Sequence, residues 1–232
     1  MRDIMFIFCF LSCIAEEPEV ETLYTYDEGL ELKAFTGKQA RQYVEPIAHL
    51  TMSLFSEFPY LYKKNLKNEK EYLERYFSAA TSRILLLFNK DSIVGFSSSI
   101  SLTEESPEIQ APFIQKGYNL SEYFYIGDAL LRAEHRNKNL MRVMAFYHTV
   151  RALKCKSNYL LFMTVDRPDH HPCRPLNYQS LDVMWRHYRF KKMPKMSVRE
   201  RWEQIDTGNI EENSLSLWYR RIQKNPIPTS KI

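Results

Sequence analysis

The stretch "YFYIGDALLRAEHRNKNLMRVMAFYHTV", residues 123–150, decides the fold. Its first part, residues 123–131, is apolar and aromatic and predicts a buried strand. The last part predicts a helix over residues 139–153, because apolar side chains recur there at the spacing of one helical face: Leu140, Val143, Met144, Tyr147 and Val150. A polar turn, residues 136–139, joins the two. Strand, turn and helix in this order form the layout of an anion site, in which backbone N–H groups at a helix start bind a phosphate.

Such turns usually contain glycine, but this chain has only 6 glycines and none lies in the turn. The scarcity excludes the glycine-rich dinucleotide loop, the P-loop and the nucleophile elbow of serine hydrolases. A Ser-His-Asp hydrolase is therefore not expected.

The composition is that of an ordinary globular protein, with 44% hydrophobic and 26% charged residues in 232. The net charge of +4 comes with basic residues gathered between residues 186 and 201. They could form a surface for an acidic partner, but a solvated strand-and-loop face is the favoured interpretation, and no nucleic-acid partner is expected. The 4 cysteines form no CxxC pair and predict no disulfide framework.

An apolar run covers residues 4–15. It is shorter than the roughly 20 residues that a transmembrane helix needs, so no membrane partner is expected. The run is similar to a signal peptide, but the charge of Arg2 is cancelled by Asp3. We expect a cytoplasmic protein, with export as the alternative, and treat residues 1–28 as an N-terminal extension or signal-like segment.

The remaining patterns predict one α+β domain over residues 29–223, followed by a flexible tail at 224–232. Helices are expected at 37–58, with a kink or restart at Pro46, and at 68–80 and 178–188. A polar loop is expected at 102–121. Further strands are expected at 30–35, 83–89, 92–100, 159–165, 196–205 and 214–222. Hairpins between several of them predict a mixed, mostly antiparallel central sheet flanked by helices.

Three motifs carry a resemblance to a known family. They are "FPYLY" at residues 58–62, "YIGDA" at residues 125–129 and the pattern RPxxHPxRPxxYxxLDxxW from Arg167 to Trp185. With the order of elements, they resemble a bacterial branch of the GNAT superfamily of acyl-CoA-dependent N-acetyltransferases. The resemblance covers about residues 30–222 and implies a GNAT-like fold, acetyl-CoA as co-substrate and no metal.

The family's pyrophosphate loop, Arg/Gln-x-x-Gly-x-Gly/Ala, falls on residues 136–141. The resemblance implies a cofactor-binding set: Leu130, Arg136, Asn137, Lys138, Asn139, Leu140 and Met141. Asn139 replaces the expected glycine, but asparagine adopts positive φ more readily than other residues with a Cβ, so the turn is expected to survive. Met141 replaces a small residue, and its side chain could fill the space that the pyrophosphate needs.

The fourth strand of this fold usually carries the catalytic base, which implies that role for Asp128. A structural carboxylate paired with an arginine is the alternative. Neighbouring apolar residues should desolvate the carboxyl and raise its pKa. Many GNAT enzymes use a tyrosine of the last helix to protonate the leaving thiolate, but the matching position is Trp185. Tyr178 and Tyr188 flank it; Tyr178 is the candidate acid, with packing as the alternative.

The proline-rich loop at residues 166–175 is expected to lie over the mouth of the cleft. Its candidate substrate-binding residues are Arg167, His171 and Arg174, which would meet an anionic group or brace a carboxylate such as Asp182. A metal site formed by the Asp169, His170, His171 and Cys173 side chains is not expected, because adjacent histidines point apart in an extended chain.

The expected function is acetyl transfer from acetyl-CoA to a primary amine on a small molecule or a protein. The rival hypothesis is a non-catalytic GNAT-fold module that binds a ligand or a partner, motivated by the altered loop and by Trp185. The sequence carries no signal for the identity of the acceptor or for the oligomeric state.

Overall fold

The computed structural model describes residues 20–26, 29–136 and 138–223. Its centre is an eight-stranded sheet in the order β1-β2-β3-β4-β5-β6-β8-β7. The strands are β1 (Glu21–Thr25), β2 (Leu30–Phe35), β3 (Arg83–Asn89), β4 (Ser92–Ser101), β5 (Tyr123–Leu131), β6 (Tyr159–Val165), β7 (Lys191–Glu203) and β8 (Ile210–Arg221). All neighbours are antiparallel except β5 and β6. The expected α+β class with a mostly antiparallel sheet is confirmed.

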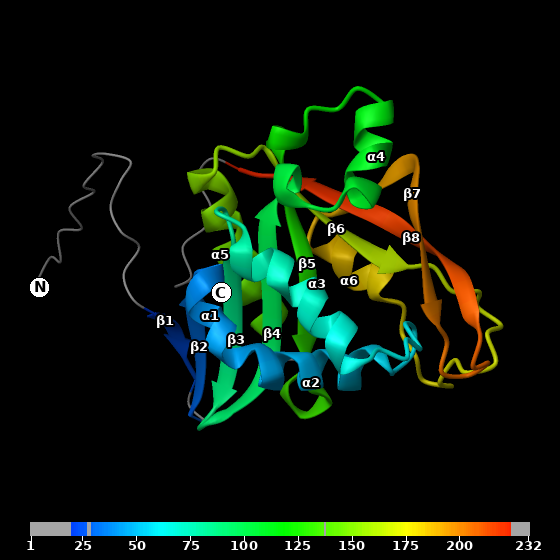
Figure 1. Ribbon diagram of the computed structural model, residues 1–232, viewed down its shortest axis with the longest axis horizontal. Helices are drawn as coiled ribbons and strands as arrows, with labels where there is room; N and C mark the ends of the chain where they lie inside the picture. Colours follow the sequence, from blue (N-terminus) through cyan, green and yellow to red (C-terminus); the bar gives the residue numbers. More distant parts are fainter. Residues whose placement is uncertain (1–19, 27–28, 137, 224–232) are drawn as a thin grey trace, which may run out of the picture.

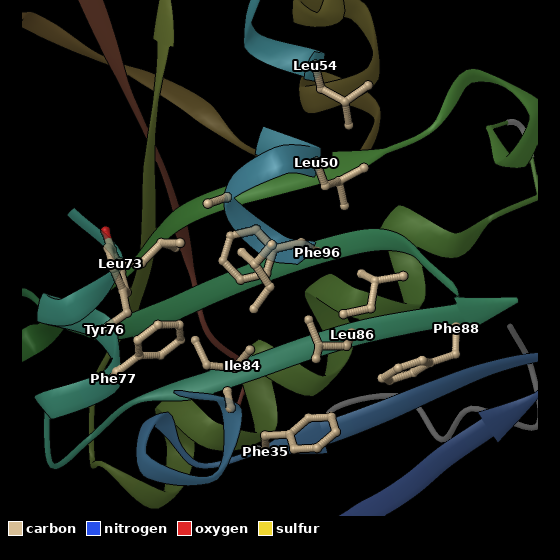
Figure 2. Packing of buried hydrophobic residues seen from close by; sticks show 14 of the residues in the cluster. Phe35, Leu50, Leu54, Leu73, Tyr76, Phe77, Ile84, Leu86, Phe88 and Phe96 are labelled. Carbon is tan, nitrogen blue, oxygen red and sulfur yellow. The ribbon is translucent and has the colours of Figure 1, made fainter. Parts of the chain in front are cut away.

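Helices cover both faces of the sheet (Figure 1). They are α1 (Gly37–Ala40), α2 (Val44–Phe55), α3 (Leu66–Ser78), α4 (Pro107–Gln115), α5 (Leu140–Lys154) and α6 (Leu181–His187). Helices α1 to α3 pack on one face of β2, β3 and β4 through a large apolar cluster (Figure 2). Helix α5 packs on the opposite face, where Leu140, Val143 and Met144 meet alternate residues of the same strands.

The structure corrects two expectations. Residues 102–121 are not only loop, because Ser106 and Pro107 start the helix α4, which buries Ile109 and Phe113. Strand β1 adds an edge to the sheet that the sequence did not indicate. The expected helix at 37–58 is interrupted by a 3-10 turn at Arg41–Tyr43 and restarts just before Pro46.

The terminal segments expected at residues 1–28 and 224–232 fall mostly or wholly outside the described residues. Among the helices that the structure describes, none is both long and apolar enough to cross a membrane.

The sheet opens between β5 and β6, which pair only from Tyr123–Tyr125 to Tyr159–Leu161 and then diverge (Figure 1). Just beyond this pairing, β5 contains a bulge: Ser97 and Ser99 of β4 lie opposite Ala129 and Ile126 of β5, so two steps on β4 match three on β5. A bulge of this kind bends a strand and re-aims its side chains. Asp128 lies in the bulge, beside the opening.

Candidate active site

A cavity of about 750 Å³ occupies the opening between β5 and β6. Its walls come from residues 126–131 of β5, the turn and first half of α5, residues 162–164 of β6, residues 54–60 and residues 178–190. Most of these side chains are apolar. Polar and charged residues also line the cavity, and Asp128 is one of them.

The Asp128 side chain is buried, with only 4% of the residue exposed. Its Oδ2 atom has no hydrogen-bond partner among the described residues. Burial raises the pKa of this carboxyl from 3.8 to about 7; the positive charge of Lys64 opposes the rise, Glu69 adds to it and the Tyr72 hydroxyl opposes it. The direction agrees with the sequence-based expectation. A carboxyl with a pKa near 7 can accept a proton at neutral pH, as a general base requires.

The backbone of Asp128 is held from β4. The Ser97 hydroxyl donates to the Asp128 carbonyl (2.7 Å), and the Asp128 N–H donates to Ser98 Oγ (3.1 Å). His148 of α5 lies between Ser97 Oγ and Ser99 Oγ, 2.7 Å from each through Nε2 and Nδ1. Because the Ser97 proton is committed to the carbonyl, Nε2–H donates to Ser97 and Ser99 donates to Nδ1.

This histidine is neutral, because burial and then Arg83 lower its pKa to about 3. The sequence analysis missed His148 and the serines. The only signal was three consecutive serines inside an otherwise apolar strand.

The turn before α5 has the shape expected of it. Asn139 is left-handed, with φ 56° and ψ 8°, and is the N-cap of α5. The N–H groups of Leu140 and Met141, in the first turn, have no acceptor within the helix. Leu130, Asn139, Leu140 and Met141 all line the cavity. Met141 also packs against the apolar cluster beneath α5.

The Arg136 side chain lies along the cavity wall. Its Nε donates to the Leu131 carbonyl (3.1 Å), and its Nη2 lies 3.2 Å from Glu57 Oε2. Of the two further members of the expected loop, Asn137 lies outside the described residues, and Lys138 is not among the residues that line the cavity.

Tyr178 lines the cavity and contacts Phe58 edge-on, with ring centroids 4.7 Å apart. Burial raises the pKa of Tyr178, and the guanidinium of Arg174, 5.1 Å from its ring centroid, opposes the rise. Trp185 instead packs on Phe162, at 4.5 Å between centroids. Tyr178 therefore offers a phenol to the cavity where Trp185 offers none.

Arg167 is bound to the protein itself. Its guanidinium donates to the carbonyls of Pro59 (2.7 Å) and Tyr60 (2.8 Å) and to Gln204 Oε1 (3.1 Å). The arginine thus holds the 58–62 segment against the sheet, and the structure shows it on backbone carbonyls rather than on a carboxylate. The ion-pair partner of Asp182 is instead Lys192, whose Nζ lies 3.2 Å from Asp182 Oδ2.

Arg174 pairs with the exposed Asp169 at 2.9 Å. Together with Arg167 it lines a second cavity of about 210 Å³, which shares Phe58, Tyr60 and Tyr178 with the first.

His171 lies near Cys173 and Asp206, with the three potential ligand atoms within 4.8 Å of one another. Its Nδ1 accepts the Cys173 N–H (3.2 Å), and its Nε2 lies 3.7 Å from Asp206 Oδ2. An imidazole needs a free lone pair on the ligating nitrogen to bind a metal. The hydrogen bonding favours a histidine–aspartate pair, and we assign no metal to it.

No family model matches the sequence, and no curated protein matches it. Solved structures do match. An acetyltransferase of the GNAT family from Staphylococcus aureus Mu50 is 12% identical, with 84% of this chain and 99% of that chain covered and a TM-score of 0.54. A ribosomal-protein-alanine N-acetyltransferase from Brucella melitensis is 10% identical, with 78% and 95% covered and a TM-score of 0.51.

An aminoglycoside 6'-N-acetyltransferase complexed with coenzyme A is 10% identical, with 79% of this chain and 93% of that chain covered and a TM-score of 0.50. At these identities the likeness establishes the arrangement of the chain and not its activity. The protein has the fold of the GNAT acetyltransferases.

Proposed function

We propose that the protein is an acetyl-CoA-dependent N-acetyltransferase that acts on a primary amine. The observation that carries the proposal is Asp128, a buried carboxyl with an unpartnered oxygen, in the cavity where a GNAT-type sheet splits. An amine is protonated at neutral pH and must lose a proton before it can attack a carbonyl carbon.

The turn and α5 supply the binding site for the co-substrate. The free N–H groups at the start of α5 and the Arg136 guanidinium would hold the pyrophosphate, and Leu130 and Leu140 offer apolar surface beside them. A structural neighbour that was solved with coenzyme A supports this assignment. When bound, acetyl-CoA would supply the acetyl group as a thioester.

Asp128 would take a proton from the ammonium group of the acceptor, which leaves the neutral amine free to attack the thioester carbon. Its side chain is one methylene shorter than the glutamate of the resembling branch, which favours transfer through a bridging water. A C–N bond forms, the C–S bond breaks, and Tyr178 would donate its phenolic proton to the leaving sulfur. The second proton lost by the nitrogen as the amide forms would restore the Tyr178 phenol through water. Arg167 would position Tyr60 and Pro59 on the acceptor side.

Titration calorimetry with acetyl-CoA, followed by a screen of amines with mass detection of the acetylated product, tests the proposal. Binding together with an acetylated amine supports it. Absence of binding at millimolar acetyl-CoA would favour the non-catalytic module. The left-handed conformation of Asn139 argues against the non-catalytic module, because Asn139 gives the turn the backbone conformation that a glycine usually supplies.

A cytoplasmic location is part of the proposal, since acetyl-CoA is a cytosolic metabolite. Cell fractionation with N-terminal sequencing tests it. A secreted or periplasmic form that begins at Glu16 would contradict it.

A further inference from the structure

The side chains of β5 do not alternate strictly between the two faces of the sheet. Ile126 and Ala129 pack in the same apolar cluster, which also contains Ala152 of α5. In a regular strand, residues three apart point to opposite faces. Ile126 and Ala129 can share the α5 face because the bulge at Gly127 and Asp128 lies between them. The two bulged residues therefore both turn to the other face.

That other face is the one that α3 covers. A Cβ on Gly127 would meet Tyr76 of α3. The titratable groups that interact electrostatically with the Asp128 carboxyl are Lys64, Glu69, Glu105 and the phenols of Tyr60, Tyr72, Tyr76 and Tyr125. Glu69, Tyr72 and Tyr76 lie on α3 itself. A one-residue slip in register would turn the carboxyl to the α5 face instead. The bulge thus decides which side of the sheet the candidate base occupies.

Serine side chains of β4 bind the backbone of the bulge. Ser97 and Ser99 lie opposite the two residues that flank it. The Ser97 hydroxyl donates to the Asp128 carbonyl (2.7 Å), and Ser98 Oγ accepts the Asp128 N–H (3.1 Å). Both backbone polar groups of Asp128 are therefore bound by serine side chains. Because a serine hydroxyl rotates to suit its partners, the direction of the Ser97 proton depends on what else contacts the oxygen.

His148 of α5 is that other contact. Only 1% of the residue is exposed, and its ring bridges Ser97 and Ser99, 2.7 Å from each hydroxyl oxygen. The neutral ring has one donor and one acceptor. When Nε2–H donates to Ser97, the Ser97 proton has to point away from the ring, toward the Asp128 carbonyl. The imidazole therefore orients the Ser97 hydroxyl and joins the two serines on either side of the bulge.

We propose that His148 is a positioning residue, which fixes the bulge of β5 through Ser97 and so keeps the Asp128 carboxyl on the α3 side of the sheet. The imidazole acts through the serine, since both of its nitrogens are bound to hydroxyls and neither contacts the carboxyl. Helix α5 would then hold the pyrophosphate at its first turn and the base from its third. The inference rests on the proposed function for the catalytic role of Asp128.

The variants separate positioning from packing. His148→Met removes both hydrogen bonds and keeps a side chain that fills the core. His148→Gln restores an amide that can donate and accept. Ser97→Ala cuts the link to Asp128 and leaves α5 intact, so it tests the inference if His148→Met does not fold. Thr149→Val is the matched control, because Thr149 is buried on the same helix and its hydroxyl accepts from Arg220 of β8 rather than from the bulge.

The first measurement is the titration of the Asp128 carboxyl by carbon-13 NMR, in protein labelled at aspartate and free of ligands. The Asp128 signal is identified by its absence from the Asp128→Asn spectrum. The second measurement is kcat for acetyl transfer across pH, together with the Kd for acetyl-CoA. The titration needs no substrate, so it tests the position of the carboxyl independently of the reaction.

We expect the titration midpoint of Asp128 to shift by about one pH unit or more in His148→Met and in Ser97→Ala, because the carboxyl moves relative to the neighbours that set its ionisation. In both variants kcat should fall at least tenfold with the Kd for acetyl-CoA unchanged. His148→Gln and Thr149→Val should keep the wild-type midpoint and rate.

An unshifted midpoint in Ser97→Ala, or an equal shift in Thr149→Val, would overturn the inference even if acetyl transfer occurs. A midpoint that shifts in Ser97→Ala and not in Thr149→Val, in a protein that acetylates no amine, would support the inference and contradict the proposed function.

Discussion

A Cβ atom on Gly127 would lie 2.1 Å from the hydroxyl oxygen of Tyr76. The tyrosine is fully buried among apolar side chains of α2, α3 and the sheet (Figure 2). Its hydroxyl donates a hydrogen bond to Glu105. The backbone beside the candidate base is therefore in direct contact with a rigid aromatic side chain. No other residue than glycine fits at position 127 without moving Tyr76.

We expect Gly127→Ala to lower the free energy of unfolding by about 1–3 kcal/mol, the usual effect of overpacking a core. Chemical denaturation measures it. In a Tyr76→Leu background Gly127→Ala should cost less, because the two residues contact each other and their effects should not add. An unchanged denaturation midpoint in Gly127→Ala would show that the contact relaxes without cost.

Asp128→Asn should lower kcat by about 10²–10⁴-fold, because the amide keeps the shape but cannot accept the proton. The Kd for acetyl-CoA should stay nearly unchanged. Asp128→Glu should retain or raise the rate. The assay follows acetyl transfer to an amine identified by the screen, across pH. A full rate with the same pH profile in Asp128→Asn would assign the carboxyl a structural role.

The raised pKa of Asp128 also predicts how stability depends on pH. The unfolded chain ionises this group near 3.8 and the folded protein near 7, so the folded state loses stability as the pH rises through that interval. Asp128→Asn should therefore be more stable than the wild type above pH 7, by at most about 4 kcal/mol, and the difference should change little below pH 3.8. Urea denaturation at pH 3.5, 5.5 and 8 measures it, and a difference that does not grow with pH would contradict the burial argument.

The turn before α5 can be tested one residue at a time. Asn139→Gly and Met141→Gly should hold or tighten the Kd for acetyl-CoA. Asn139→Ala should destabilise the left-handed turn by about 1–2 kcal/mol. Arg136→Ala should weaken binding by about 1–3 kcal/mol through the loss of a charge-assisted contact. Much weaker binding in the double glycine variant would mean that the loop does not hold the pyrophosphate.

Arg167→Met should leave the Pro59 and Tyr60 carbonyls without their donors and lower the free energy of unfolding by about 1–3 kcal/mol. Because Tyr60 lines the cavity, KM for the amine should rise while the Kd for acetyl-CoA stays unchanged. Arg174→Met is the matched control, since Arg174 pairs with the exposed Asp169 and should matter less for stability. Equal effects of the two variants would contradict the positioning role of Arg167.

Local pattern accounted for most elements of the fold. Strand β6 was expected at residues 159–165 and is found there, because a short run of branched and aromatic residues has few alternatives. The left-handed Asn139 also followed from its own side chain. Helix α4 was missed because it buries only Ile109 and Phe113 in a mostly polar stretch, and β1 because it is a largely exposed edge strand.

The site was less accessible to sequence reasoning. The sequence placed Asp128 on its strand, but the direction of its side chain depends on a bulge that forms only where β5 pairs with β4. His148 meets its serines from a different element. Each of these arrangements is made by contacts between distant parts of the chain, and the spacing of apolar residues along the sequence does not predict such contacts.

The short pairing of β5 with β6 has a mechanical consequence. Five antiparallel strands lie on one side of it and three on the other, and the two groups share only the hydrogen-bonded rungs from Tyr123 to Tyr125. At the closed end of this junction the rings of Tyr123 and Tyr159 stack, 5.1 Å apart and 22° from parallel. Widening the space around Asp128 would separate the two groups of strands at the unpaired end while the paired end stays joined. The stacked Tyr123 and Tyr159 rings would then lie at the hinge between the two groups of strands.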